Sequence, residues 1–517
     1  MLHYYFFVVY ISKTITIRRK KVKAQMVKNT FILVLFSFAS KILGFGREVT
    51  QASLFGATNN TDALILAFLF LQYITGGISA IIEKVIIPKV AIYKEYNGEL
   101  NEKVNRFFFF MFLVLIIVSS MLLISIKYIL FFMKVQNPEV VTKMIYFIIP
   151  IAIIMSINSL LQAVLKAFNQ FKVVGVVMLV QNSIIIITIL LLHNLYGIYS
   201  VLIGWLIANA INYVHILFET KKIGFYWSTS FLFTQKSISS EIKRFISYNR
   251  IIAPVLGLVL VSYVNSFLEK KITFGLGEGA TTMIYYGTII NDLVYSIFII
   301  SAMSVLIPAL SKSDNKQLMT QNMIRIIIMC FLPITVIILC YAHEAVEFLL
   351  YFGDFSINNV RSISNIFIGF SLGLMCLGIR ETLYTRAYSS GNTKLPFKAN
   401  LVASSVNIFF NFILSLKFGI IGVAAGTTIS IYASMFYMGY HIKEKYVDLE
   451  FIKKISIGVM GTISVNLIYI TIFRNPKNIF AIAGIALFSL VVYIIILYLL
   501  QTKEVVKLIN GIKERAK

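Results

Sequence analysis

The chain has 517 residues, of which 58% are hydrophobic and only 13% are charged, and its mean hydropathy is +0.84. This composition excludes a water-soluble enzyme or an extracellular module. A helix of about 20 predominantly apolar residues crosses the hydrocarbon layer and satisfies its own backbone hydrogen bonds. We therefore predict an all-α polytopic membrane protein. We interpret the net charge of +25 as a signal of membrane topology, with no nucleic acid as partner.

The N-terminal segment, residues 1–25, combines a short apolar run with a basic cluster over residues 18–23. A secretory signal carries its charge before the apolar run, so this segment does not match one. We predict an N-terminal extension with Met26 as the true start, and the alternative is a basic anchor on the membrane surface.

Apolar runs bounded by polar turns predict about fourteen spans along the chain. They lie near residues 29–56, 61–92, 107–132, 144–168, 173–193, 197–217, 246–267, 279–309, 320–341, 360–388, 396–416, 419–440, 454–473 and 479–500. Lysine and arginine concentrate in alternate loops and in the C-terminal tail, which predicts that both termini are cytoplasmic.

The sequence contains an internal repeat. An Ile-Pro pair recurs at residues 87–88 and 307–308, and a Gly-Ile pair recurs at residues 197–198 and 419–420. The two offsets agree closely, so we predict a duplicated six-helix unit of the kind found in transporters with two lobes. The predicted parts are an N-terminal lobe over 26–218, a cytoplasmic linker over 219–244, a C-terminal lobe over 245–441, and two further helices with a basic tail over 442–517.

The first span carries a cluster of charged residues. Ionisable groups at membrane depth are costly, so they are functional candidates by default. At 100° per residue Lys41 and Glu48 lie on nearly one face of the helix, with Arg47 on the adjoining flank. A guanidinium offers a bidentate fork to phosphate and an ammonium offers a point charge, so this helix could meet an anionic head group. The alternative is internal charge compensation by Glu48 that only joins helices.

Other charges interrupt later spans. Asp62 begins the second span, where capping of that helix is the alternative to a functional role. Further candidates for the polar interior or for gating and coupling are Glu83, Lys84, Arg250, Asp292, Arg380 and Glu381. Lys84 could equally extend to the membrane surface, and Glu83 could compensate it.

Some functional classes lack their motifs in this sequence. There is no phosphate-binding G-x-x-x-x-G-K-[ST] loop, which argues against ATP as the direct driver. Histidines and the three cysteines, Cys330, Cys340 and Cys376, have no metal-ligand spacing. We predict a protein that is not an enzyme and that needs no metal or cofactor, with membrane potential or a monovalent cation as candidate driving forces.

Residues 40–63 resemble the MurJ/MviN family of lipid II flippases, within a superfamily of multidrug and polysaccharide-lipid exporters. The family pattern S-R-x-L-G-x-x-R-D is matched by residues 40–48, and F-G-A-x-x-x-T-D-A by residues 55–63. Residues 306–312, which follow a Tyr-Tyr pair, and residues 388–396 are similar to two further family motifs. The resemblance extends at low identity from about residue 29 to residue 500.

This resemblance implies two six-helix lobes that alternate between inward-open and outward-open forms around a cationic cavity. It implies that Arg47 is a diphosphate ligand, that Lys41 replaces the first cavity arginine of the family, and that Asp62 is a structural or gating acid. The last two helices would shape a groove for the polyprenyl tail. Two family arginines are absent here, with Ile74 or Thr75 and the region of Ile289 in their places. Lys84, Arg250 or Arg380 could supply the missing charge.

The predicted function is a flippase for a polyprenyl-diphosphate-linked saccharide, with lipid II as the first choice. A capsule or exopolysaccharide precursor on the same carrier is the main alternative. A multidrug or cation antiporter and a membrane enzyme acting on polyprenyl-linked sugars are weaker ones. Predicted partners are the lipid-linked saccharide, membrane lipids and cell-wall synthesis proteins, and the predicted location is the bacterial cytoplasmic membrane.

Overall fold

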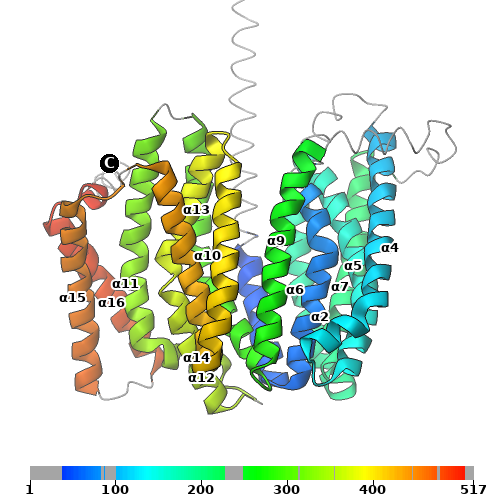
Figure 1. Cartoon of the computed structure of the whole chain (residues 1–517), viewed down its shortest axis with the longest axis horizontal. Helices are drawn as coiled ribbons and strands as arrows, with labels where there is room; N and C mark the ends of the chain where they lie inside the picture. Colours follow the sequence, from blue (N-terminus) through cyan, green and yellow to red (C-terminus); the bar gives the residue numbers. More distant parts are fainter. Residues whose placement is uncertain are drawn as a thin grey trace, which may run out of the picture. The chain divides into compact units, whose positions relative to one another are not determined.

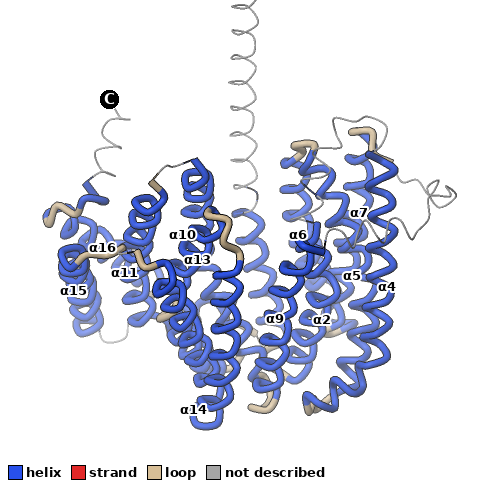
Figure 2. Tube along the Cα trace, turned by 45° about the horizontal axis from the view of Figure 1, so that its top comes forward, coloured by secondary structure: helices blue, strands red, loops and turns tan. Residues whose placement is uncertain are grey.

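A computed structural model describes residues 36, 38–82, 87, 100–226, 249–312, 315–353, 355–444, 446–473 and 478–506. Every regular element in these residues is a helix, as Figures 1 and 2 show. Nine of the described helices are long and apolar enough to cross a membrane, or ten if a bent pair is counted as one span. Each predicted span contains helical residues, so the prediction of an all-α polytopic membrane protein is confirmed. The predicted N-terminal extension, with Met26, lies outside the described residues.

The chain divides into two compact units. The first comprises the described residues within Met1–Gln51, Ala67–Tyr128 and Glu139–Leu256, and the second those within Ala52–Leu66, Ile129–Pro138 and Gly257–Lys517. Most of the predicted linker over 219–244 lies outside the described residues, so the lobe boundaries derived from the sequence stay a prediction.

Polar side chains join the helices of the first unit. The unit is built from a helix over residues 38–55, α2 (Asn59–Ile81), α4 (Leu100–Met133), α5 (Pro138–Ala167), α6 (Phe171–Tyr196) and α7 (Tyr199–Lys222), some of which extend into the second unit. The buried Asn158 of α5 donates to the backbone oxygen of Asn209 in α7 at 2.9 Å. Asn212 of α7 donates to the backbone oxygen of Val177 in α6 at 3.3 Å. Such bonds hold helices together where lipid offers no competing partner.

Two glycines form the same sharp bend in the two units. Gly197 lies between α6 and α7 with φ 52° and ψ −134°. Gly419 bends α14 (Lys394–Ile442) with φ 57° and ψ −133°. An L side chain is strained in this positive-φ conformation, so glycine is required at both positions. They are 222 residues apart (419 − 197), and the shared geometry agrees with the duplication inferred from the sequence.

The second unit has an apolar core between helices far apart in sequence. It contains α9 (Asn249–Phe274) from residue 257 onward, α10 (Ala280–Lys312), α11 (Lys316–Leu350), α12 (Ile357–Ser371), α13 (Leu374–Ser389), α14, α15 (Leu449–Phe473) and α16 (Ile479–Leu499). Buried Ile284, Ile366 and Val423 bring α10, α12 and α14 together. Figure 1 shows α15 and α16 side by side, and Tyr493 of α16 packs with Phe451 of α15 in a further core cluster.

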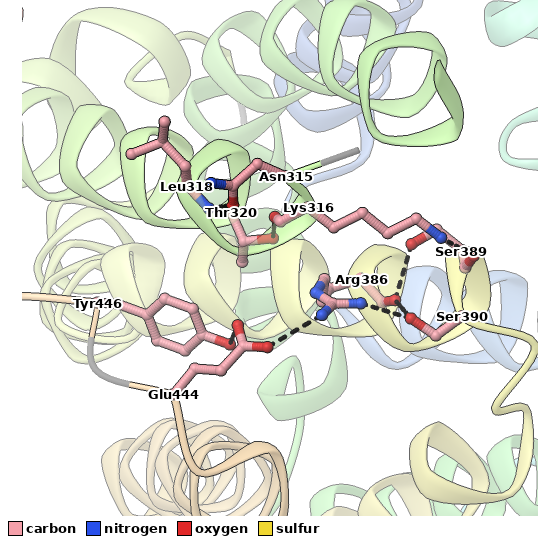
Figure 3. A network of polar contacts seen from close by, with 9 residues as sticks. All are labelled: Asn315, Lys316, Leu318, Thr320, Arg386, Ser389, Ser390, Glu444 and Tyr446. Carbon is pink, nitrogen blue, oxygen red and sulfur yellow. Dashed lines mark hydrogen bonds and ion pairs between the residues drawn. The ribbon is translucent and has the colours of Figure 1, made fainter. Parts of the chain in front are cut away.

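In the second unit, a polar network joins α11, α13 and the residues that follow α14, as Figure 3 shows. Arg386 of α13 donates to Glu444, which follows α14, at 2.9 Å. The Tyr446 hydroxyl donates to the other oxygen of this carboxylate at 2.9 Å. Burial, together with the bond to Glu444, raises the pKa of Tyr446. Lys316 of α11 donates to the backbone oxygen of Ser389 at 2.8 Å.

Arg325 of α11 ties the C-terminal helices to the rest of this unit. Its guanidinium donates to Glu504, beyond α16, at 3.0 Å and to Asp448, before α15, at 2.9 Å. It also donates to the backbone oxygen of Tyr446 at 3.3 Å and lies 5.1 Å from the ring centre of Phe451. Two carboxylates and an aromatic ring therefore surround one arginine that is only 9% exposed.

Candidate functional site

Arg47, on the helix over residues 38–55, is the centre of the candidate site in the first unit. It forms an ion pair with the neighbouring Glu48. It also donates to the side-chain oxygen of Asn182 in α6 at 3.2 Å. Its guanidinium carbon lies 5.1 Å from the ring centre of Trp205 in α7, within the range of a cation–π interaction. Three segments of the unit thus converge on one guanidinium.

The Asn182 side chain is itself oriented by the helix that carries Arg47. Its amide nitrogen donates to both the backbone oxygen and the hydroxyl of Ser40, each at 3.2 Å. Because the nitrogen is used in this way, the amide oxygen is the atom that faces Arg47. A Cβ added at Gly44 would lie 3.6 Å from this amide, so the glycine of the first-span motif packs directly on Asn182.

The three charged residues of the first span differ in burial. Glu48 is 6% exposed, Arg47 is partly buried and Lys41 is exposed. The ion pair between Arg47 and Glu48 matches the charge compensation that the sequence left open as an alternative. A guanidinium has five N–H groups, so Arg47 could donate to a bound anion as well as to Glu48.

Asp62 caps a different helix from the one that the sequence suggested. Its carboxylate accepts from the backbone N–H of Gly279 at 2.9 Å and of Thr282 at 2.7 Å, and from the Thr282 hydroxyl at 2.6 Å. These donors are at the start of α10, where unpaired N–H groups and the helix dipole favour an anion. Glu278 in turn accepts from the backbone N–H of Asn59, the first residue of α2, at 3.1 Å.

This reciprocal capping depends on close backbone approach. Gly279 has φ +73°, and a Cβ there would lie 2.5 Å from the backbone oxygen of Ala57. Only glycine therefore fits at this position. Asp62 and Thr282 are 220 residues apart, which is the offset of the Ile-Pro repeat, so the contact joins corresponding positions of the duplicated sequence.

Three further predicted residues belong to the second unit. Arg380 and Glu381 of α13 form an ion pair at 2.8 Å, and Asp292 of α10 is exposed. Of these three residues, Arg380 and Glu381 are thus in direct contact with one another.

Three of the remaining predicted residues lie wholly or partly outside the described residues. Glu83 and Lys84 lie outside the described residues. Arg250 lies in the first turn of α9, and only its backbone is described. Ile74 is 3% exposed and Thr75 is 5% exposed, so the position where the resembling family has an arginine is occupied by core residues.

Three residues with prominent roles escaped the sequence analysis. Asn182 and Glu278 look like ordinary polar residues in a span and in a turn, and Trp205 looks like an ordinary apolar residue of a span. Polar residues inside an otherwise apolar run are a usable signal, because they seek partners in the membrane. That signal exists for Asn182, but nothing local in the sequence marks Trp205.

No cluster of three or more His, Cys, Asp or Glu side chains suited to a metal ion occurs among the described residues. Long apolar helices and a duplicated bend define a polytopic helical membrane protein with an internally repeated fold. The sequence pattern of the family described as "Lipid II flippase MurJ" matches residues 51–480, most of the chain. The chain belongs to this family, which confirms the predictions of a flippase and of a protein that is not an enzyme.

Curated relatives match over most of their length. A "Probable lipid II flippase MurJ" of Rickettsia prowazekii is 24% identical, covering 82% of this chain and 85% of the relative. The "Lipid II flippase MurJ" of Thermosipho africanus is 25% identical, covering 90% of this chain and 95% of the relative. These matches agree with the family assignment.

Solved structures share the fold. A lipid II flippase MurJ in an inward closed conformation matches with a TM-score of 0.77 and 22% identity, covering 90% of this chain and 98% of that one. An inward-facing multidrug transporter of the MATE family matches with a TM-score of 0.61 and 11% identity, covering 78% and 94%. At these identities the likeness concerns the fold.

Proposed function

We propose that this protein carries lipid II across the bacterial cytoplasmic membrane by alternating access, with Arg47 as a ligand of the diphosphate. The observation that carries the proposal is the guanidinium of Arg47, held by Glu48, Asn182 and Trp205 within a span. An arginine placed at membrane depth is costly unless it has partners, and a fork of N–H groups suits phosphate oxygens. Family membership supports lipid II as the substrate.

The ion pair with Glu48 gives Arg47 an anionic partner within the protein. An incoming diphosphate would compete with the carboxylate for the same N–H groups, so Arg47 would have an anionic partner both before and after binding. Lys41, which is exposed on the same helix, would add a second cation. Lys84, Arg250 and Arg380 remain candidates for further positive charge in the path of the head group.

Asp62 would act in conformational change and not in binding. It joins the start of α2 to the start of α10 through three hydrogen bonds. Helix ends that cap one another form a contact that is either made or broken, which suits a gate between two conformations. Glu83, Asp292 and Glu381 are the remaining candidates for gating or coupling.

The driving force would come from the membrane. The inside-negative potential favours outward movement of an anion, and a monovalent cation could contribute. With both termini cytoplasmic, the basic loops face the cytoplasm, in line with the positive-inside rule. Predicted partners beyond the lipid-linked saccharide are membrane lipids and cell-wall synthesis proteins, and the predicted lobes over 26–218 and 245–441 would be the moving parts.

A rescue experiment tests the proposal. The wild type, Arg47→Ala and Arg361→Ala are expressed in a bacterium depleted of its own lipid II flippase, with the amount in the membrane measured for each. Arg361 is an exposed arginine of α12 and serves as the matched control. We expect the wild type and the control to restore growth and Arg47→Ala to fail.

Two outcomes would contradict the proposal. A wild type that is well expressed but does not rescue would mean that another lipid-linked saccharide, such as a capsule precursor, is the substrate. Rescue by Arg47→Ala equal to the wild type would remove Arg47 from the diphosphate site.

A further inference from the structure

We infer that Asn182 and Trp205 are positioning residues that orient the Arg47 guanidinium towards its anionic ligand without neutralising its charge. This inference rests on the proposed function, in which Arg47 binds a diphosphate. It adds two residues from α6 and α7 to the ion pair of Arg47 and Glu48, which are neighbours on the helix over residues 38–55.

Asn182 fixes one edge of the guanidinium. Its oxygen accepts from Arg47 Nη1 at 3.2 Å, while its nitrogen donates to Ser40. The nitrogen also lies 3.3 Å from the backbone oxygen of Met178, one turn earlier in α6. The amide therefore connects the two helices and has a single orientation in which its oxygen can meet Arg47.

Trp205 fixes the plane of the guanidinium. Its ring centre lies 5.1 Å from the guanidinium carbon of Arg47. The ring is in turn held by Phe68 of α2, with the two ring centres 5.2 Å apart and the planes tilted by 51°. A tryptophan face attracts a cation and leaves the N–H edges of the guanidinium available to acceptors.

Asn182 and Trp205 are both uncharged, so they do not change the net charge at Arg47. Arg47 and Glu48 together carry no net charge, and an amide and an indole leave this sum unchanged. A second carboxylate in place of the amide would lower the net charge of the site by one, and a less positive site attracts an anionic ligand less strongly. Asn182 and Trp205 thus orient the guanidinium without adding a negative charge that would compete with the ligand.

Binding measurements on the purified full-length protein in lipid nanodiscs test this inference. The probe is undecaprenyl diphosphate, which carries the diphosphate without the saccharide. Asn182→Asp is nearly isosteric, and we expect it to weaken binding by at least about tenfold, since a hydrogen bond to a charged group is replaced by a competing charge. Asn358→Asp, which adds the same charge at an exposed position of α12, should leave binding within about twofold, because exposed charges are well screened.

The tryptophan is tested by a pair of substitutions. Trp205→Phe keeps an aromatic face and should weaken binding by about twofold, whereas Trp205→Leu should weaken it by about fivefold. Thermal unfolding of each variant is measured alongside, and only variants that unfold as the wild type does are compared. Equal binding by the phenylalanine and leucine variants would overturn the role of the aromatic face.

A background with Arg47→Lys separates positioning from general structure. A lysine ammonium is a point charge without a plane to orient, so Asn182→Ala should weaken binding about fivefold in the wild type but hardly at all in the lysine background. An equal loss in both backgrounds would mean that Asn182 acts only on packing and would overturn the inference. A wild type that does not bind the probe, although it rescues growth, would instead overturn Arg47 as a diphosphate ligand and this inference with it. Failure of both binding and rescue would overturn the proposed function.

Discussion

Arg47, on the helix over residues 38–55 of the first unit, and Arg325, on α11 of the second, each form an ion pair, yet their surroundings differ. Arg47 has one carboxylate, one neutral amide and one aromatic ring among its identified contacts. Arg325 has two carboxylates, a backbone oxygen and an aromatic ring. Two carboxylates therefore face Arg325, whereas the carboxylate identified beside Arg47 is that of Glu48.

Under the proposed function, this difference would separate an arginine that binds a ligand from one that joins helices. A guanidinium held by two carboxylates would repel a third anion, so Arg325 is suited to holding α15 and α16 against α11. A guanidinium with one carboxylate and neutral supports can exchange that carboxylate for a ligand. We expect the number of neighbouring carboxylates, more than burial, to decide whether such an arginine can bind an anionic ligand.

The largest expected effect concerns transport. Arg47→Ala should abolish rescue of flippase-depleted cells, and Arg47→Lys should retain part of it because the charge remains while the fork is lost. Arg325→Ala, compared at equal amounts in the membrane, should keep transport within about twofold, since no ligand contact is lost. Growth and membrane level are measured together. Equal loss of transport in both alanine variants would erase the distinction between the two arginines.

The next effect is on stability. Arg325→Ala leaves the carboxylate of Glu504, with its side chain 11% exposed, without its cation. We expect a loss of about 3 kcal/mol in the free energy of unfolding, measured by thermal or denaturant unfolding in detergent. Arg361→Ala is the control, and its exposed side chain should give less than about 0.5 kcal/mol. An unchanged stability in Arg325→Ala would mean that the C-terminal helices are held by apolar packing alone.

A third buried charge extends the comparison. Asp62, which is 2% exposed, is held mainly by N–H and O–H donors. Asp62→Asn places an amide against those donors, and we expect a loss of about 2 kcal/mol in unfolding free energy. Thr282→Val, which removes only the hydroxyl, should cost about half as much. Glu139→Gln, at an exposed carboxylate, is the control. Should Asp62→Asn unfold as the wild type does, the capping contact would not contribute to stability.

The smallest effect is a pH dependence at Asp448. The backbone N–H of Phe451 and the charge of Arg325 hold the pKa of this carboxyl below its ordinary value. A lowered pKa in the folded state gives stability that is present above the ordinary pKa and lost as the pH falls through the folded value. Because the side chain is 60% exposed, Asp448→Asn should cost only about 0.5 kcal/mol at pH 7.

This difference between wild type and Asp448→Asn should shrink as the pH falls through the lowered pKa of folded Asp448, and it should disappear once Asp448 is protonated in both the folded and the unfolded state. Unfolding midpoints at neutral and acidic pH measure it. A difference that persists unchanged in acid would point to a packing effect of the substitution.

Much of the candidate site could be predicted, and its limits have physical causes. Arg47, Glu48 and Asp62 are visible in the sequence because ionisable residues are conspicuous in an apolar run. The partners that define their roles come from distant segments: Asn182 is 135 residues from Arg47, and Thr282 is 220 residues from Asp62. Local pattern cannot pair residues over such separations.

The sequence by itself determined the class of fold. Long apolar runs can satisfy their backbone only as helices in lipid, and the repeated Gly-Ile pair predicted a duplicated unit, in which the structure has matching bends at Gly197 and Gly419. Only the tertiary structure decided which charge meets which partner. It assigned the carboxylate of Asp62 to the start of α10, two carboxylates to Arg325, and an amide and an indole to Arg47. The reason is that helix formation depends on neighbours in sequence, whereas a buried charge is balanced by neighbours in space.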